Sequence, residues 1–325
     1  MRAIALSQYG GPEVLSIVDV PDPVPGPGQV LVRVRATSLN RADLLQRMGH
    51  YPEPDPKPAH EILGLDVAGE VVQAPSGAFQ AGDRVMALVA GGGYAEYALV
   101  PERSLLLMPT GWSYEQAAAF PEVFYTAYDA LVQLPAAVGD TVLVHAAASG
   151  VGSSAVQLLA AMGAFPIGTV GSAEKAARVL TLGAVRAVNY HDEDFVAVCR
   201  EFTGGRGVDG IVDLVGASYF ERNVQVLARR GRQIVVGTVG GVQATVPLDL
   251  LMGKRLAITG TSLRSRPPEE KMALAQAVKQ HVLPLCETGR LAPVIDRVYP
   301  WTEARDAHQR MESNLNIGKI VLSIS

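Results

Sequence analysis

The sequence predicts an α/β protein in which a β-rich N-terminal domain is followed by a doubly wound parallel sheet. Three features lead to this fold class. Strand-like alternation fills the first third of the chain, strand and helix patterns alternate between about residues 113 and 265, and a turn of small residues follows the strand expected near residue 141. Alternating strands and helices are typical of a parallel sheet covered by helices on both faces.

Length and composition limit the classes of protein and partner. The 325 residues correspond to about two domains. The formal net charge of -4 gives no global attraction for nucleic acid. No apolar run reaches the roughly 18 residues of a membrane span, and the N-terminus has no apolar signal core. Cys199 and Cys286 lack metal-ligand spacing, so we expect two reduced thiols in a cytoplasmic protein.

The first third consists of short strand patterns separated by glycine and proline. Residues 29–39, QVLVRVRATSL, alternate valine with arginine, which is the period of a half-buried strand. Three similar segments follow at short intervals: DVAGEVVQA, DRVMALVA and GYAEYALVP. Closely spaced strands with turn signals predict a small barrel-like β domain.

The middle of the chain alternates helix and strand patterns. A helical segment opens with the capping-box pair Ser113 and Gln116, and Pro121 is expected to divide it in two. Strands such as TVLVHAA, FPIGTVG and RQIVVGTVG then alternate with helices such as SYFERNVQVLARRG. The tail from about residue 266 has two helix and two strand patterns, too few for a separate core, so it is expected to pack on the first domain.

The segment TVLVHAAASGVGSSAVQ places a small-residue turn between a buried strand and a helix. Such a turn lets backbone N–H groups approach a pyrophosphate at the helix N-terminus. The G-x-G-x-x-G/A pattern fits in two registers, either Ala147, Ser149 and Gly152 or Gly150, Gly152 and Ala155. Its place inside a βαβ unit favours dinucleotide binding over a tight turn without a ligand.

The end of the second strand, GTVGSAEK, indicates which dinucleotide is bound. NAD enzymes usually carry an acidic residue there for the ribose 2′-hydroxyl, and no residue from Gly168 to Ala173 is acidic. Ser172 offers a hydroxyl at a helix N-terminus, and Lys175 follows one turn later. This combination favours a 2′-phosphate and therefore NADPH, although Glu174 lies between the two.

Several motifs along the whole chain resemble the zinc-independent quinone oxidoreductase branch of the medium-chain dehydrogenase/reductase superfamily. They include SLNRADLLQRMGHY, ILGLDVAGEV, AAAFPEVFYTAYDAL, VLVHAAASGVGSSAVQLLAAMGA and NIGKIVL. The resemblance implies a GroES-like β-rich catalytic domain at 1–122, a Rossmann NADPH-binding domain at 123–265 and a C-terminal return to the catalytic domain at 266–325. It also implies a homodimer, joined through the sheet edge at KRLAITGTS.

The resemblance also implies site residues by their place in these motifs. Asn40 and Tyr51 would lie at the nicotinamide end and serve catalysis. The remaining residues would hold the cofactor: Thr126, Ser149, Gly150, Val151, Gly152, Gly171, Ser172, Lys175, Tyr190, Gly237, Thr238, Val239, Ser262, Leu263, Arg264 and Asn316.

No metal site is expected. Asn40 stands where zinc members carry a cysteine, Asp66 lies in the segment where they carry His-Glu, and a neutral amide is a poor zinc ligand. Asn40 would hydrogen-bond substrate or cofactor ribose, or it could simply cap a turn. Tyr51 could donate to a reduced carbonyl oxygen or only form part of the wall. Asp43 and Asp66 are more typical of residues that support the fold.

The predicted function is NADPH-dependent hydride transfer to a small-molecule quinone or related conjugated carbonyl. One alternative is a 2-enoyl reductase acting on a thioester or enone. Another is a non-catalytic protein that binds NADPH or RNA, against which the net charge counts. The acceptor itself is not encoded in any motif, because hydride transfer from a bound nicotinamide requires little more than alignment.

Overall fold

The computed structural model describes residues 1–51 and 60–324 and divides into two compact units. The first unit combines residues 1–123 with the chain from Arg266 onward, and the second comprises residues 124–265. Each unit has its own sheet and its own apolar core. Within the described ranges, no helix is long and apolar enough to cross a membrane.

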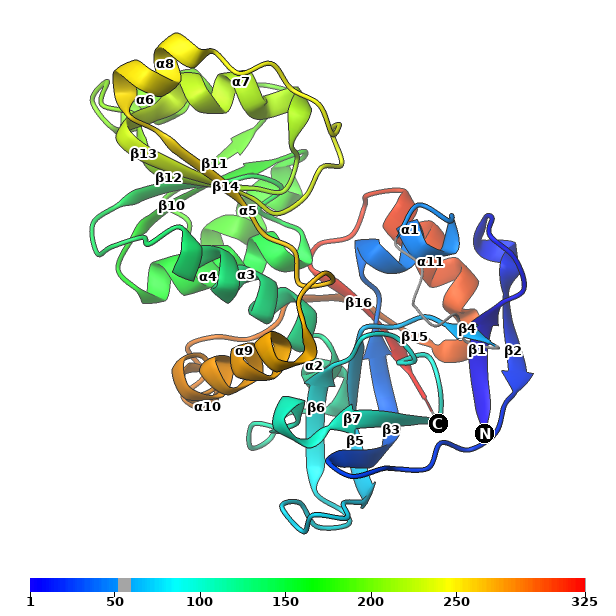
Figure 1. The fold of residues 1–325 in the computed structure, drawn as a ribbon. Coiled ribbons are helices and arrows are strands. Elements are labelled where there is room, and N and C mark those ends of the chain that lie inside the picture. Colours follow the sequence, from blue (N-terminus) through cyan, green and yellow to red (C-terminus); the bar gives the residue numbers. More distant parts are fainter. Residues whose placement is uncertain (52–59, 325) are drawn as a thin grey trace. The chain divides into compact units, whose positions relative to one another are not determined.

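The second unit is a six-stranded parallel sheet in the order β11-β10-β9-β12-β13-β14. Figure 1 shows α4 on one face of this sheet and α6 and α7 on the other. The predicted doubly wound sheet is therefore confirmed. Its elements are β9 (Thr141–Val144), α4 (Gly150–Ala161), β10 (Phe165–Val170), α5 (Ala173–Thr181), β11 (Arg186–Asn189), α6 (Phe195–Phe202), β12 (Val208–Asp213), α7 (Ala217–Val226), β13 (Leu227–Val235), α8 (Leu248–Lys254) and β14 (Ala257–Gly260).

The helix expected over SYFERNVQVLARRG ends earlier than its sequence pattern indicates. Helix α7 stops at Val226, and the next residues belong to β13, where Leu227 pairs with Val208 of β12. Lys254 Nζ donates to the carbonyl oxygen of Leu227 at 2.7 Å and to two carbonyls before it. Strand pairing and burial therefore override the local helix propensity.

The first unit is mainly antiparallel. Its larger sheet has the order β15-β16-β3-β5-β6-β8, with β7 also paired to β3, and a three-stranded sheet has the order β2-β1-β4. The strands are β1 (Arg2–Leu6), β2 (Leu15–Asp19), β3 (Gln29–Ser38), β4 (Glu61–Ile62), β5 (Asp66–Gln73), β6 (Arg84–Leu88), β7 (Tyr97–Pro101), β8 (Leu106–Leu107), β15 (Ile295–Pro300) and β16 (Lys319–Ser323).

Helices of the first unit, and one that continues into the second unit at residue 124, begin largely where the sequence places them. Ser113 caps α2 (Tyr114–Ala118) in a capping box with Gln116, and α3 (Pro121–Gln133) begins at the proline expected to divide this segment. The tail has three helices instead of the expected two, because a short α10 (Leu283–Glu287) follows α9 (Pro268–His281) and precedes α11 (Ala304–Glu312). Helix α1 covers Arg41–Arg47.

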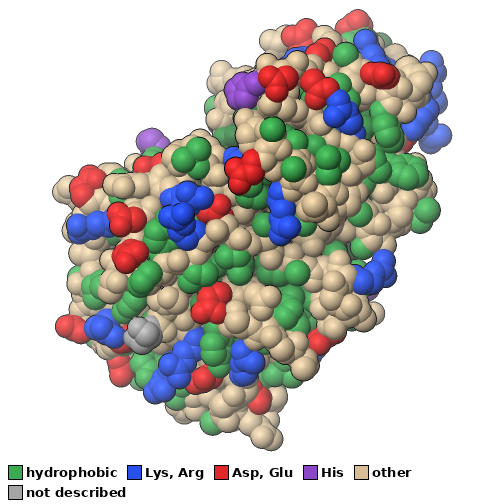
Figure 2. All heavy atoms as spheres, turned by 180° about the vertical axis from the view of Figure 1, so that it is seen from behind, with side chains coloured by type: hydrophobic (Ala, Val, Ile, Leu, Met, Phe, Trp, Pro, Cys, Tyr) green, Lys and Arg blue, Asp and Glu red, His purple; other side chains and the backbone are tan. Residues whose placement is uncertain are grey.

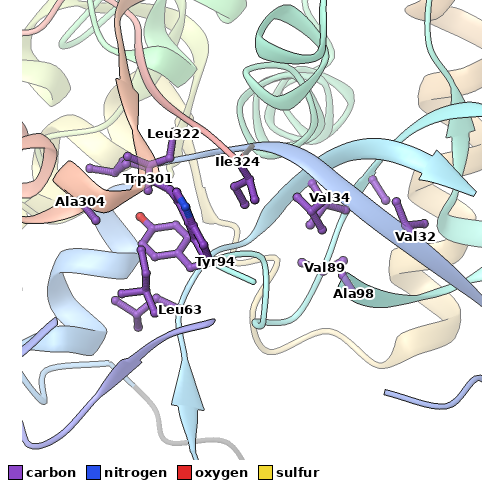
Figure 3. Packing of buried hydrophobic residues seen from close by; sticks show 14 of the residues in the cluster. Val32, Val34, Leu63, Val89, Tyr94, Ala98, Trp301, Ala304, Leu322 and Ile324 are labelled. Atoms are coloured by element: carbon purple, nitrogen blue, oxygen red, sulfur yellow. The ribbon is translucent and has the colours of Figure 1, made fainter. Parts of the chain in front are cut away.

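The last strand completes the core of the first unit. Strand β16 pairs antiparallel with β3, with Val321 opposite Ser38. Figure 3 shows Trp301 and Leu322, from the end of the chain, beside Tyr94 and Leu63 from its first third. Segments about 280 residues apart in sequence are thus neighbours in one sheet, which places the start of β16 next to the start of α1.

Candidate active site

The turn between β9 and α4 leads directly into the N-terminus of a helix. Ala146 has φ 47°, an uncommon value for a residue with a side chain. Ser149 is the N-cap of α4, and its hydroxyl accepts from the Gly152 N–H at 3.1 Å. The N–H groups of Gly150 and Val151, in the first helical turn, have no acceptor within the helix. They could bind a pyrophosphate.

Gly152, which both sequence registers share, cannot carry a side chain. A Cβ there would overlap the carbonyl oxygen of Ala146 and lie 2.8 Å from the Cα of Ala147. Its hydrogen lets α4 pack directly on the turn that precedes it, the role of the third glycine in dinucleotide-binding turns.

Four predicted adenosine-site residues meet at the ends of β10 and β11. The Ser172 hydroxyl caps α5 and accepts from the Lys175 N–H at 3.2 Å, so Lys175 lies in the first turn of that helix. Tyr190 follows β11, and a Cβ on Gly171 would lie 2.9 Å from its Cζ. A hydroxyl, a helix N-terminus and a lysine therefore share one corner, a combination suited to a phosphate.

The other predicted cofactor residues of the second unit are arranged along the same edge of the sheet. Carboxyl ends of parallel strands meet at one edge, where Gly237, Thr238 and Val239 follow β13 and Ser262, Leu263 and Arg264 follow β14. Thr126 is buried in α3. Asn316, in the first unit, donates from Nδ2 to the Gly318 carbonyl at 2.8 Å. Their binding of a cofactor stays a prediction.

In the first unit, Asn40 begins α1 inside a buried polar cluster. Its backbone N–H donates to Asp43 Oδ2 at 2.7 Å, and its side chain donates from Nδ2 to Asp66 Oδ2 at 2.8 Å. Lys319 at the start of β16 donates to Asn40 Oδ1 and lies 3.1 Å from Asp66 Oδ2. Only 5% of Asn40 is exposed, against 0% of Asp66 and 2% of Lys319. Asn40 is therefore the N-cap of α1, and its side chain also belongs to the buried polar cluster.

Asp66 has a complete set of donors. Its Oδ2 accepts from the Ser38 hydroxyl at 2.7 Å as well as from Asn40 and Lys319, and its Oδ1 accepts from the Glu122 N–H at 2.7 Å. A buried carboxylate needs such compensation. The group is thus occupied by protein donors on both oxygens.

A second buried group of polar side chains surrounds helix α1. Burial raises the pKa of Asp43 to about 7, while N–H donors and the Lys319 ammonium act in the opposite direction. The Tyr94 hydroxyl lies 3.5 Å from Asp43 and 3.2 Å from His308 Nε2. Burial, together with the Arg47 charge, lowers the pKa of His308 to about 3, so this histidine is neutral. Arg47 therefore donates to an unprotonated His308 Nδ1 at 3.3 Å.

Sequence reasoning missed Lys319, which has the most direct contact with Asn40. The resemblance carried by NIGKIVL assigns no role to its lysine. A lysine directly before three buried apolar residues of a strand was the available signal, because a lysine that deep needs an anionic partner.

Tyr51, just beyond α1, is partly buried and is the last described residue before position 60. Among the residues with described positions, no group of three or more His, Cys, Asp or Glu could hold a metal ion.

Comparison with known proteins places both units among dehydrogenases. Residues 26–110 match the alcohol dehydrogenase GroES-like domain, and residues 150–280 match the zinc-binding dehydrogenase family. The chain is 36% identical over 328 residues to a quinone oxidoreductase of Lama guanicoe, covering 99% of this chain and 97% of that protein.

Two solved structures are similar over the full length. One is an NAD-dependent alcohol dehydrogenase, with a TM-score of 0.91, 34% identity and 100% of both chains covered. The other is the Escherichia coli quinone oxidoreductase complexed with NADPH, with a TM-score of 0.89, 33% identity and the same coverage.

Proposed function

This chain belongs to the quinone oxidoreductase family of the medium-chain dehydrogenases/reductases, and we propose that it transfers hydride from NADPH to quinones or related conjugated carbonyls without zinc. The observation that carries the proposal is the Asn40–Asp66–Lys319 cluster. Asp66 already accepts from four protein donors, and a lysine ammonium occupies the space beside it. A metal ion would have to displace that cation.

Quinones suit a site without a metal. Bound NADPH would supply a hydride and become NADP⁺, the hydride would convert the quinone into a hydroquinone anion, and one solvent proton would complete the hydroquinone. The aromatic product makes the acceptor strong, so little electrophilic help is needed. Asn40 and Tyr51 orient the acceptor and donate to its developing negative oxygen.

A panel of acceptors tests this function. Purified protein with NADPH should reduce a quinone, should reduce an enone more slowly, and should not oxidise a primary alcohol with NADP⁺. Treatment with a chelator should leave quinone reduction unchanged. Appreciable alcohol oxidation that is lost on chelation would overturn the proposal and favour the chemistry named for the alcohol dehydrogenase relative.

The same panel separates the alternatives. A 2-enoyl reductase would prefer the enone or a thioester, and a non-catalytic protein would oxidise no NADPH with any acceptor. Binding to RNA has little electrostatic support, because the net charge is -4. On the face drawn in Figure 2, basic side chains are interspersed with acidic ones.

A cytoplasmic location agrees with the two cysteines, Cys199 and Cys286. Both are buried and unpaired, and burial raises the pKa of each thiol to about 12.

Tyr51→Phe should slow quinone reduction only modestly, by about tenfold or less, because a stable hydroquinone anion needs little from one donor. Reduction of an unactivated enone should suffer more from the same change. Steady-state kinetics on both acceptors measure the difference. Abolished quinone reduction in Tyr51→Phe would mean that the hydroxyl is an essential proton donor.

Lys175→Ala should weaken NADPH binding by about tenfold or more and leave NADH binding nearly unchanged. A charge-assisted hydrogen bond to the 2′-phosphate is worth roughly 1.5–3 kcal/mol, and about 1.4 kcal/mol corresponds to tenfold. Fluorescence titration with each cofactor measures both constants. Lys279→Ala, an exposed lysine on α9, is the matched control. An equal loss with both cofactors would place Lys175 away from the phosphate.

We also propose a homodimer through the β14 edge of the parallel sheet. β14 is an edge strand, and exposed apolar side chains lie on the segment before it: Val239, Val242, Leu248 and Met252. Light scattering should return about twice the 34.4 kDa chain mass. Met252→Lys should weaken the dimer, whereas Val138→Lys, at a similarly exposed position in the same unit, should not. A wild-type monomer at micromolar concentration would contradict this.

A further inference from the structure

The cluster around Asn40 determines which way its side-chain amide points. An ammonium has only donors and an ionised carboxylate only acceptors. Lys319 donates to Asn40 Oδ1, and Asn40 Nδ2 donates to Asp66 Oδ2 at 2.8 Å. The reversed amide would set its NH₂ group against the ammonium and its oxygen against the carboxylate. Lys319 and Asp66 therefore allow one orientation of the amide only.

In this orientation Asn40 keeps one Nδ2 hydrogen for a further partner. Its Oδ1 accepts from Lys319, its backbone N–H donates to Asp43, and its other Nδ2 hydrogen donates to Asp66. Within residues 1–51 and 60–324, Nδ2 has no second acceptor. The remaining Nδ2 hydrogen makes Asn40 a donor. Because Lys319 polarises the carbonyl end of the amide, it also strengthens that donor.

We propose that Lys319 and Asp66 are positioning residues that hold the Asn40 amide as a hydrogen-bond donor for the acceptor oxygen that becomes negative during reduction. This rests on the proposed function, in which Asn40 meets the acceptor. Lys319 acts through Asn40 and does not itself contact the substrate. The Lys319 charge is balanced by Asp66, so the pair directs the amide without adding net charge to the site.

A double-mutant cycle tests whether Lys319 acts through Asn40. Lys319→Met should lower kcat for quinone reduction by about threefold to tenfold, below the full loss of one oxyanion donor, with less change in the dissociation constant for NADPH. In the Asn40→Ala background the same substitution should change kcat less than about twofold, because interacting residues are not additive. Lys319→Arg should recover part of the activity. Equal losses in both backgrounds, or no loss in either, would overturn the proposal.

A second measurement does not depend on activity. The side-chain amide signals of Asn40, assigned by their loss in Asn40→Ala, should show slow hydrogen exchange in the wild type and fast exchange in Lys319→Met. Unchanged exchange would overturn the proposal even if the wild type reduced no quinone. That lack of activity would instead refute the proposed function.

Two further variants protect the test from effects on folding. If Lys319→Met does not fold, Asp66→Asn combined with Lys319→Met removes both charges and should show the same loss of kcat and the same fast amide exchange. Lys254→Met is the matched control, because this lysine donates to three carbonyl oxygens in the second unit. It should lower stability and leave kcat unchanged. A fall of kcat in Lys254→Met comparable to that in Lys319→Met would show that any lost structural lysine has this effect, and would refute positioning.

Discussion

Asp66→Ala is expected to lower the free energy of unfolding by about 3–5 kcal/mol, the usual cost of removing one partner from a buried ion pair. The substitution strands the Lys319 ammonium, which is 2% exposed, and takes an acceptor from Ser38 and Asn40. Urea unfolding of both proteins at neutral pH measures the difference.

The control for Asp66→Ala is an ion pair at the surface. Glu269→Ala removes the partner of Arg103 at 2.7 Å, where both side chains are largely exposed. Its effect should stay below about 1 kcal/mol. If Asp66→Ala were no more destabilising than Glu269→Ala, the buried cluster would not be held together as described.

Gly152→Ala should both destabilise the protein and remove most of its affinity for NADPH. The added methyl group has no space, because backbone atoms of Ala146 and Ala147 already fill it. Overpacking typically costs about 1–3 kcal/mol, and displacement of α4 from the turn should weaken cofactor binding by about tenfold or more. Thermal unfolding and fluorescence titration measure the two effects.

A second glycine provides the comparison for Gly152→Ala. Gly253 lies in α8, and a Cβ there would meet nothing within 4 Å. Gly253→Ala should therefore be neutral or stabilise the helix, by up to about 1 kcal/mol, because glycine is a poor helix former. Normal NADPH affinity in Gly152→Ala would mean that the turn after β9 does not hold the pyrophosphate.

Local features of the fold were predictable because each depends on residues close in sequence. The capping box of Ser113 and Gln116, the helix start at Pro121 and the Ser172 cap were all visible as short patterns, and the structure confirms them. The end of α7 was not, since pairing of Leu227 with Val208 decides it. The role of Ser149 as a helix cap was also missed, although serine is a favoured N-cap.

The candidate site was predictable only in part, for the same reason. Residues of the turn between β9 and α4 are neighbours in sequence, so a motif can describe them. Lys319 and Asn40 are 279 residues apart, and their contact depends on the pairing of β16 with β3. No periodicity or spacing identifies which lysine meets a given amide across that distance.

The return of the chain end to the first unit has a consequence for biosynthesis. Domains generally fold as units during translation, from the N-terminus onward. The second unit is continuous, so it can close once residue 265 has left the ribosome. The first unit lacks β16, one of the strands paired with β3, and the cation beside Asp66 until residues 319–323 are made. The nascent chain therefore carries a folded second unit before its first unit receives the final strand, and a chain that stops short of Lys319 would leave Asp66 without its cation.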